Sequence, residues 1–403
     1  MKNYELLAPA GDFSMLSAAV KAGADAIYFG LQNDFNMRSA AKNFKLSDLK
    51  EMREICDSSS RKVKMYLTLN TIVYNNEIEK VEEVIKSVKG KVDAIICWDL
   101  AVIQLCRKHD VPFHISTQAS ISNIEAAKFY KDLGAERIVL AREVSLKQAR
   151  EISKVAEIEM FCHGAMCVAI SGRCFMSQHL FNSSANRGKC LHPCRRPYEV
   201  TITDETSGKK LRLENQRVLS AKDLCTLPFI EEMKKAGVIS FKIEGRNRDA
   251  RYVDVVVRAY RKALDKKLTK EEIKDLLKEL ETVYNRGFSS GFYLGLPTPD
   301  DFAKIENSGA TERKIYIGKI LHYYDKPKTA SLKIEALFVK TGDKISIIGN
   351  TTGIESFNVE SIYLNEEQAE VAKKGDEVAI KVPSRVREND AVYKIISVQN
   401  SSA

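Results

Sequence analysis

Short apolar segments alternate with amphipathic helical patterns along most of the chain, and this alternation constrains the fold more than any other feature. Most of the apolar segments are rich in β-branched or aromatic residues, and all are short enough to be buried parallel strands. They lie at 5–8, 24–30, 63–70, 92–98, 113–116, 137–141, 157–161 and 240–244. The helical patterns that separate and follow them lie at 13–22, 48–58, 77–88, 100–108, 124–133, 146–155 and 248–265.

Eight such strand segments within roughly 250 residues predict an α/β fold, a (β/α)₈ barrel of the TIM-barrel type. A doubly wound parallel sheet is the alternative. The turn after the first strand reads Ala8-Pro9-Ala10-Gly11-Asp12 and lacks the GxGxxG pattern typical of that second fold. Asp12 is a suitable N-cap for the first helix, because its side chain can accept a hydrogen bond from a free backbone N–H.

A barrel collects its functional residues at the carboxyl ends of its strands. The residues at those positions are polar, and several are charged without an obvious packing role. They include Gln118, Arg142, Glu143, His163, Glu244 and Arg246. Loops are polar in any case, so a surface or ion-pair role is the plain alternative for each of them.

The segment 159–197 interrupts the alternation and is dense in cysteine. It contains Cys162, Cys167, Cys174, Cys190 and Cys194, and no Asp or Glu occurs from Phe161 through Tyr198. Five Arg and Lys residues fall inside the same segment. Thiolates bring negative charge, so a basic, cysteine-rich segment indicates a metal centre beside an anionic substrate.

The cysteine spacing leaves three alternatives open. The chain has no CxxC motif, which structural zinc sites usually contain in pairs, and its spacing also differs from the compact ferredoxin pattern. Widely spaced thiolates suit an iron–sulfur cluster, while zinc and unligated core cysteines stay possible. Cys56, Cys97 and Cys106 lie in apolar patterns and are expected to pack in the core.

Composition and charge indicate which partners and which cellular compartment to expect. The chain has 403 residues and a net charge of +9, which is a mild indication of an anionic partner such as nucleic acid. Neither a signal peptide nor an apolar run of about 20 residues is visible, so we expect a cytoplasmic protein with no membrane partner. Cysteines should then be thiols rather than disulfides.

The remainder of the chain predicts a hairpin and a second domain. Residues 198–213 read as a hairpin that turns at Ser207-Gly208, within an insertion spanning 162–239. A Gly/Pro-rich linker covers 287–303, and period-two alternation follows from Arg313. We therefore predict a barrel domain at 1–303 and a small all-β barrel domain at 304–403.

Several motifs give the chain a specific resemblance. The stretches EMFCHGAMC at 159–167 and GRCFMS at 172–177, with ELLAPAGD at 5–12 and KIEGR at 242–246, are similar to blocks of a family of collagenase-like peptidases of unknown catalytic type. The chain most resembles the branch of that family that synthesises 5-hydroxyuridine in tRNA. The C-terminal domain resembles the translation-factor-like barrel found in some members.

The resemblance implies a 4Fe–4S cluster and oxygen-independent hydroxylation of the wobble uridine of tRNA, with prephenate as a small anionic co-substrate. By position it implies Cys167, Cys174, Cys190 and Cys225 as the cluster ligands. Cys194 then either substitutes for Cys190 or lies near the cluster as an additional thiol.

The remaining site residues are assigned by chemistry. Arginine forks match carboxylates, so Arg38, Arg142, Arg173 and Arg246, with Gln118, are candidates for binding the co-substrate. Glu143, His163 and Glu244 are candidates for proton transfer. Phe175, next to a cluster ligand, either stacks on an unpaired base or shields the cluster.

Two other functions compete with hydroxylation. A collagenase-like peptidase needs an activated nucleophile or a metal-bound water, and Cys174 with His163 or His179 is the available pair. There is no HExxH, and the GxSxG at 287–291 follows a charged helix rather than a strand. The second competing function is a non-catalytic RNA-binding or assembly protein whose cluster is structural.

Overall fold

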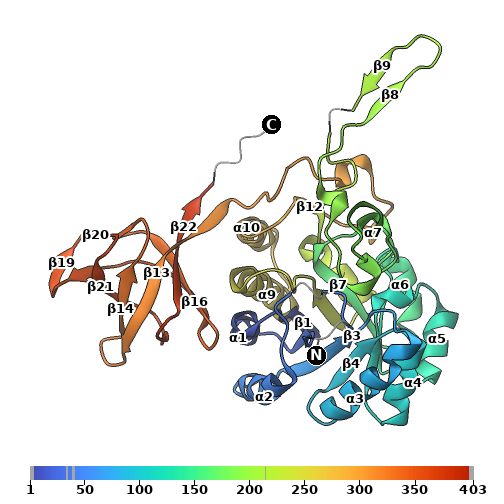
Figure 1. Ribbon diagram of the computed structural model, residues 1–403, viewed down its shortest axis with the longest axis horizontal. Helices are drawn as coiled ribbons and strands as arrows, with labels where there is room; N and C mark the ends of the chain where they lie inside the picture. The colour runs from blue at the N-terminus through green and yellow to red at the C-terminus, as the bar shows by residue number, and fades with distance from the viewer. Residues whose placement is uncertain (1–3, 33–34, 39–40, 214, 399–403) are drawn as a thin grey trace.

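The computed structural model describes residues 4–32, 35–38, 41–213 and 215–398. Eight parallel strands form a closed barrel, because β11 pairs with both β7 and β1 (Figure 1). The predicted (β/α)₈ fold is therefore confirmed. The strands are β1 (Glu5–Pro9), β2 (Ala26–Phe29), β3 (Lys64–Leu69), β4 (Ala94–Cys97), β5 (Phe113–Ile115), β6 (Arg137–Val139), β7 (Ile158–Ala165) and β11 (Ser240–Ile243).

Helices cover the outside of the barrel, and each of the seven helical patterns predicted from the sequence contains one of them. Asp12 caps the first, since its Oδ1 accepts a hydrogen bond from the Met15 backbone N–H at 3.0 Å. No helix in the part of the chain that the structure describes is long and apolar enough to cross a bilayer. The helices are α1 (Phe13–Ala22), α2 (Leu49–Asp57), α3 (Ile78–Val88), α4 (Leu100–Lys108), α5 (Ile124–Asp132), α6 (Leu146–Ile152), α8 (Ile230–Lys235), α9 (Ala250–Asp265) and α10 (Lys270–Glu281).

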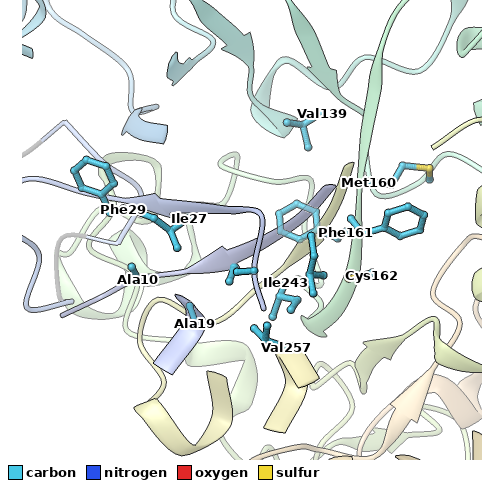
Figure 2. Packing of buried hydrophobic residues seen from close by; sticks show 14 of the residues in the cluster. Ala10, Ala19, Ile27, Phe29, Val139, Met160, Phe161, Cys162, Ile243 and Val257 are labelled. Atoms are coloured by element: carbon cyan, nitrogen blue, oxygen red, sulfur yellow. The ribbon is translucent and has the colours of Figure 1, made fainter. Parts of the chain in front are cut away.

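One apolar core joins the barrel to its helices. Figure 2 shows Ala19 of α1 and Val257 of α9 close to Ile243 of β11, and all three belong to the same cluster of buried side chains. Cys162 of β7 is fully buried within this cluster.

The amino-terminal end of the barrel interior is filled by buried charges. The Lys242 Nζ donates to Glu159 Oε1 at 2.8 Å, and the Ser240 Oγ lies 3.0 Å from carboxylate oxygens of both Glu159 and Glu5. Arg137 pairs with Glu5 in the same layer. These paired groups fill that end, so space for a ligand opens toward the carboxyl ends of the strands.

A long insertion connects β7 to β11. It contains α7 (Met176–Phe181), the antiparallel strands β8 (Thr201–Thr203) and β9 (Lys210–Arg212), and β10 (Asp223–Cys225). The predicted hairpin is confirmed, and every residue of its two strands is exposed as it projects away from the barrel (Figure 1). β10 runs antiparallel beside β7 and pairs in parallel with β12 (Phe288–Ser289), and neither was predicted.

The C-terminal domain is built from antiparallel strands around its own apolar core. An eight-stranded sheet and a two-stranded sheet, β15 with β20, confirm the all-β prediction. The strands are β13 (Glu312–Tyr324), β14 (Thr329–Ile334), β15 (Phe338–Lys340), β16 (Lys344–Gly349), β17 (Gly353–Asn358), β18 (Ile362–Leu364), β19 (Glu367–Ala369), β20 (Val371–Lys373), β21 (Glu377–Lys381) and β22 (Ala391–Ser397).

The two domains are in contact through α1 and the turn between β16 and β17. Ser17 Oγ and Lys21 Nζ donate to the backbone carbonyls of Asn350 and Thr352, at 2.5 and 2.7 Å. Gly353 lies against α1 so closely that an added Cβ would be 2.8 Å from the Ala18 backbone nitrogen. Backbone contact of this kind fixes how the second domain lies on the barrel.

Candidate active site

A cavity of about 330 Å³ opens at the carboxyl ends of the barrel strands, under the cysteine-rich segment. Its lining comes from strand ends on one side and from the segment between Ala165 and Arg195 on the other. This is the end of a barrel where functional residues gather, and the cavity is of ligand size.

Positive charge dominates this cavity. Among the described residues that line it, seven carry a cationic side chain and Glu244 carries the only carboxylate. An excess of fixed cations in a buried cavity favours an anionic ligand. The cations are Arg38, Arg142, Arg195, Lys242, Arg246, Arg248 and Arg286.

Arg246 is held in the cavity by neutral groups. Its two terminal nitrogens donate to Thr68 Oγ1 at 2.7 Å and to Asn36 Oδ1 at 2.6 Å. An added Cβ on Gly30 would be only 2.6 Å from the same guanidinium, so this glycine leaves room for it. Burial lowers the pKa of Arg246 to about 10, which still leaves it charged at neutral pH. Its charge is thus available to an anion.

Arg38 and Glu244 form an ion pair at the cavity wall, with 3.2 Å between Nη2 and Oε1. Burial raises the pKa of Glu244, but the charges of Arg38, Arg248 and Arg142 outweigh it and lower that pKa to about 2. A carboxylate this acidic stays ionised and is a weak base. Glu244, predicted to transfer protons, is better suited to orienting Arg38.

Arg142 and Gln118, two of the candidates for binding the co-substrate, also line the cavity. Arg142 donates to the Ala165 carbonyl, and its guanidinium carbon lies 4.0 Å from the centre of the Phe161 ring. Gln118 is buried and accepts a hydrogen bond from the Ser116 hydroxyl. Of the five predicted substrate-binding residues, four therefore meet in one cavity.

Sequence reasoning missed three of the cavity arginines. Arg248 follows the KIEGR motif by two residues, and its guanidinium carbon lies 3.6 Å from the centre of the Tyr284 ring. Arg286 donates to the buried carboxylate of Asp223 at 2.5 Å, and Arg195 donates to the Ala221 carbonyl at 2.6 Å. Arg195 lies in the insertion, whereas Arg248 follows β11 and Arg286 follows α10, so their spacing along the chain does not show that they meet in one cavity.

Four thiols form one wall of the cavity: Cys167, Cys174, Cys190 and Cys194. Burial raises the pKa of Cys194, and the neighbouring Cys167, Cys190 and Cys174 add to this effect. Burial likewise raises the pKa of Cys190, and the neighbouring Cys167 and Cys174 raise it further. The four thiols are thus electrostatic neighbours, and all of them are free.

Cys225, predicted as the fourth cluster ligand, does not line this cavity in the structure. It is buried on β10, where the Tyr260 hydroxyl lies 3.7 Å from its sulfur. Burial raises its pKa to about 11. Its backbone pairs with His163 of β7. The structure brings Cys194 to the other three thiols instead.

Three other predicted site residues lie outside the cavity lining. His163 packs against the rings of Tyr252, Tyr260 and Phe288, and burial lowers its pKa to about 3. Glu143 is exposed to solvent. Arg173 is exposed as well, and it stacks over the ring of Trp98. The structure therefore gives His163 a packing role rather than the predicted role in proton transfer.

The family model described as peptidase family U32 matches residues 11–302 of the chain. The chain belongs to peptidase family U32. The matched region contains every barrel strand except β1, together with the cysteine-rich segment and all the residues that line the cavity. The resemblance inferred from the sequence motifs is thereby confirmed, and the cavity lies within the matched region.

Relatives in this family carry names of two kinds. A protein named collagenase from Porphyromonas gingivalis is 41% identical over 98% of this chain and 98% of its own length. A protein named tRNA hydroxylation protein P1 from Bacillus subtilis is 35% identical over 90% of this chain and 87% of its own. A protein named 23S rRNA 5-hydroxycytidine C2501 synthase from Escherichia coli is 40% identical over 65% of this chain but 39% of its own length.

Proposed function

We propose that this protein is an RNA hydroxylase that converts the wobble uridine of tRNA to 5-hydroxyuridine without molecular oxygen. A 4Fe–4S cluster and prephenate, a dicarboxylate, complete the site in this proposal. The observation that carries it is the combination of four free thiols and seven cations around a single cavity. Relatives named as tRNA and rRNA hydroxylating proteins support the reaction type.

The thiols fit a cluster by their chemistry. Cys167, Cys174, Cys190 and Cys194 would be its ligands, and when bound it would supply an electron-transfer centre beside the cavity. Within the described residues, no three His, Cys, Asp or Glu side chains lie close enough together to hold a single metal ion. Thiolates around a multi-atom cluster stand farther apart than the ligands of one ion, so the wide arrangement is compatible with the larger group.

The arginines fit a small dicarboxylate. Arg246 is anchored by Thr68 and Asn36, so its charge has no carboxylate partner among these hydrogen bonds. Arg142 is similarly anchored by a backbone carbonyl. Two such fixed cations, with Arg248 nearby in the lining, can bind two carboxylates while Gln118 supplies a neutral polar contact. Glu244 keeps Arg38 oriented.

The test of this function is nucleoside mass analysis of tRNA from a strain that lacks the gene. We expect 5-hydroxyuridine and its derivatives to disappear and to return when the wild-type gene is supplied. Complementation with Arg246→Gln should fail, while Arg53→Gln should succeed, because Arg53 is a half-buried arginine of α2 that pairs with Asp93 and does not line the cavity. Unchanged 5-hydroxyuridine in the deletion strain would refute the proposal.

Peptide hydrolysis is the second candidate, and the collagenase-named relative favours it. Of the two pairs predicted for it, Cys174 with His163 or with His179, the first is not formed, because His163 packs against Tyr260 of α9 and does not line the cavity. Digestion of denatured collagen by protein freed of iron would support this function, provided that one substitution in the cavity abolishes it.

A further inference from the structure

We infer that the exposed face of the cysteine-rich segment, residues 166–197, is a binding surface for single-stranded RNA, with Phe175 as a platform on which a base stacks. This inference rests on the proposed function and specifies how the RNA reaches the cavity. It starts from the exposure of Phe175, which is 74% although the residue is large and apolar. Phe175 follows the thiol Cys174 directly, at the start of α7.

Arginines of this segment pair with aromatic rings. Three arginines of the segment lie over aromatic rings, with 5.8 Å from Arg173 to Trp98, 4.8 Å from Arg187 to Tyr74 and 4.2 Å from Arg196 to Phe181. Trp98 is tied to the cavity rim, because its Nε1 donates to the Asn70 carbonyl at 3.0 Å. Flat rings and guanidinium planes are the groups on which unpaired bases stack.

The charge of the segment complements a phosphate backbone. Arg187 is neutralised by Glu77, but Arg173 and Arg196 present exposed cationic side chains. No acidic residue occurs between Phe161 and Tyr198 to offset them. Cations that track the backbone beside aromatic platforms are the combination by which proteins hold single-stranded nucleic acid.

The apolar side chains of this face also argue for stacking. Ile170, Leu180 and Leu191 are each about half exposed, so with Phe175 the segment that covers the cavity leaves several large apolar side chains in water. A duplex offers phosphates but few base faces, whereas an unpaired loop offers both. The surface therefore favours the single strand, which is also the form in which a base can enter the cavity.

The test is fluorescence anisotropy of the full chain, purified anaerobically, with a short labelled RNA either single-stranded or annealed into a duplex. We expect preference for the single strand and affinity that falls as salt rises. Phe175→Ala should weaken single-strand binding about tenfold, within the range for loss of one stacked base, and Phe175→Trp should restore it. The matched control is Phe129→Ala, which removes an exposed phenylalanine from α5 and should change nothing.

Complementation separates this inference from the proposed function. If the wild-type gene fails to restore 5-hydroxyuridine, the proposed function itself fails. If it restores 5-hydroxyuridine and Phe175→Ala binds and modifies RNA like the wild type, the surface inference alone is overturned. Preference for the duplex, or an equal loss with Phe129→Ala, overturns it too. Reduced binding and reduced modification confined to Phe175→Ala, rescued by tryptophan, support it.

Discussion

Cys194 and Cys225 have opposite surroundings, although both follow β7 in the chain. Cys194 lies in the cavity wall with three other thiols, and Cys225 is buried beside Tyr260. We therefore expect Cys194→Ser to lose iron after anaerobic reconstitution and Cys225→Ser to retain it. Iron and acid-labile sulfide per chain measure the difference. Iron loss in the Cys225 variant with retention in the Cys194 variant would restore the assignment made from sequence position.

The burial of Arg246 leads to a prediction about how binding of the co-substrate depends on pH. Burial disfavours the charged form and lowers the pKa of the arginine to about 10, so the wild type should bind prephenate equally well from about pH 6 to pH 8. A lysine has an ordinary pKa of about 10.4, and the same burial lowers that pKa toward neutral pH. Affinity of Arg246→Lys should therefore fall as pH rises through this range.

Isothermal titration at several pH values checks this expectation. Arg246→Gln is the control, since it carries no charge and should bind weakly at every pH. A flat profile for Arg246→Lys at wild-type affinity would show that this charge does not contact the ligand.

His163 shows why single-residue roles were hard to predict. Alternation along a strand places Phe161 and His163 on the same face. The pairing of β7 with β11 shifts between these residues, with Phe161 opposite Lys242 and His163 opposite Ile243. This irregularity leaves Cys162 as an extra residue and turns His163 toward α9, while Phe161 lines the cavity. A bulge of this kind depends on how the partner strand pairs, so the sequence of β7 alone does not show it.

At the scale of elements, the β8–β9 hairpin is separable from the barrel. Both strands are exposed, and the Leu213 N–H donates to the Val200 carbonyl at 3.0 Å, so the two ends already meet. Replacing residues 201–212 by an Asn-Gly turn should leave the melting temperature and the iron content unchanged. Calorimetry and iron analysis measure these. A large drop in melting temperature would mean that the hairpin stabilises the barrel.

Strands and helices could be predicted from the sequence where burial requires a regular pattern of apolar residues. The eight barrel strands and their helices follow from short apolar runs and from caps such as Asp12. β10 and β12 were missed because they are short and lie outside the alternation of strands and helices. β10 depends on its pairing with β7, and β12 depends on its pairing with β10. The sequence left the place of Cys194 open, since spacing along the chain does not show which cysteines face each other.

For the molecule as a whole, the contact between domains was invisible in the sequence and yields a prediction. Gly353 has a positive φ of 66° and lies against the backbone of Ala18. Gly353→Ala should destabilise the protein by about 1–3 kcal/mol more than Gly342→Ala in urea unfolding. Gly342 also has a positive φ, 88°, but its added Cβ would meet nothing within 4 Å, so it controls for backbone strain.

Equal destabilisation by the two substitutions would show that the domains do not depend on this contact. Limited proteolysis in the linker before β13 gives a second measurement. Faster cleavage in Gly353→Ala alone would place the loss of stability at the contact between the domains.

The order of segments in the chain also bears on how the protein is made. All four cavity thiols precede β11, the strand that closes the barrel between β7 and β1. During synthesis, Cys167 through Cys194 therefore leave the ribosome while the barrel still lacks its last strand. A cluster delivered at that moment would meet an open site, whereas one delivered after synthesis must pass through the finished mouth.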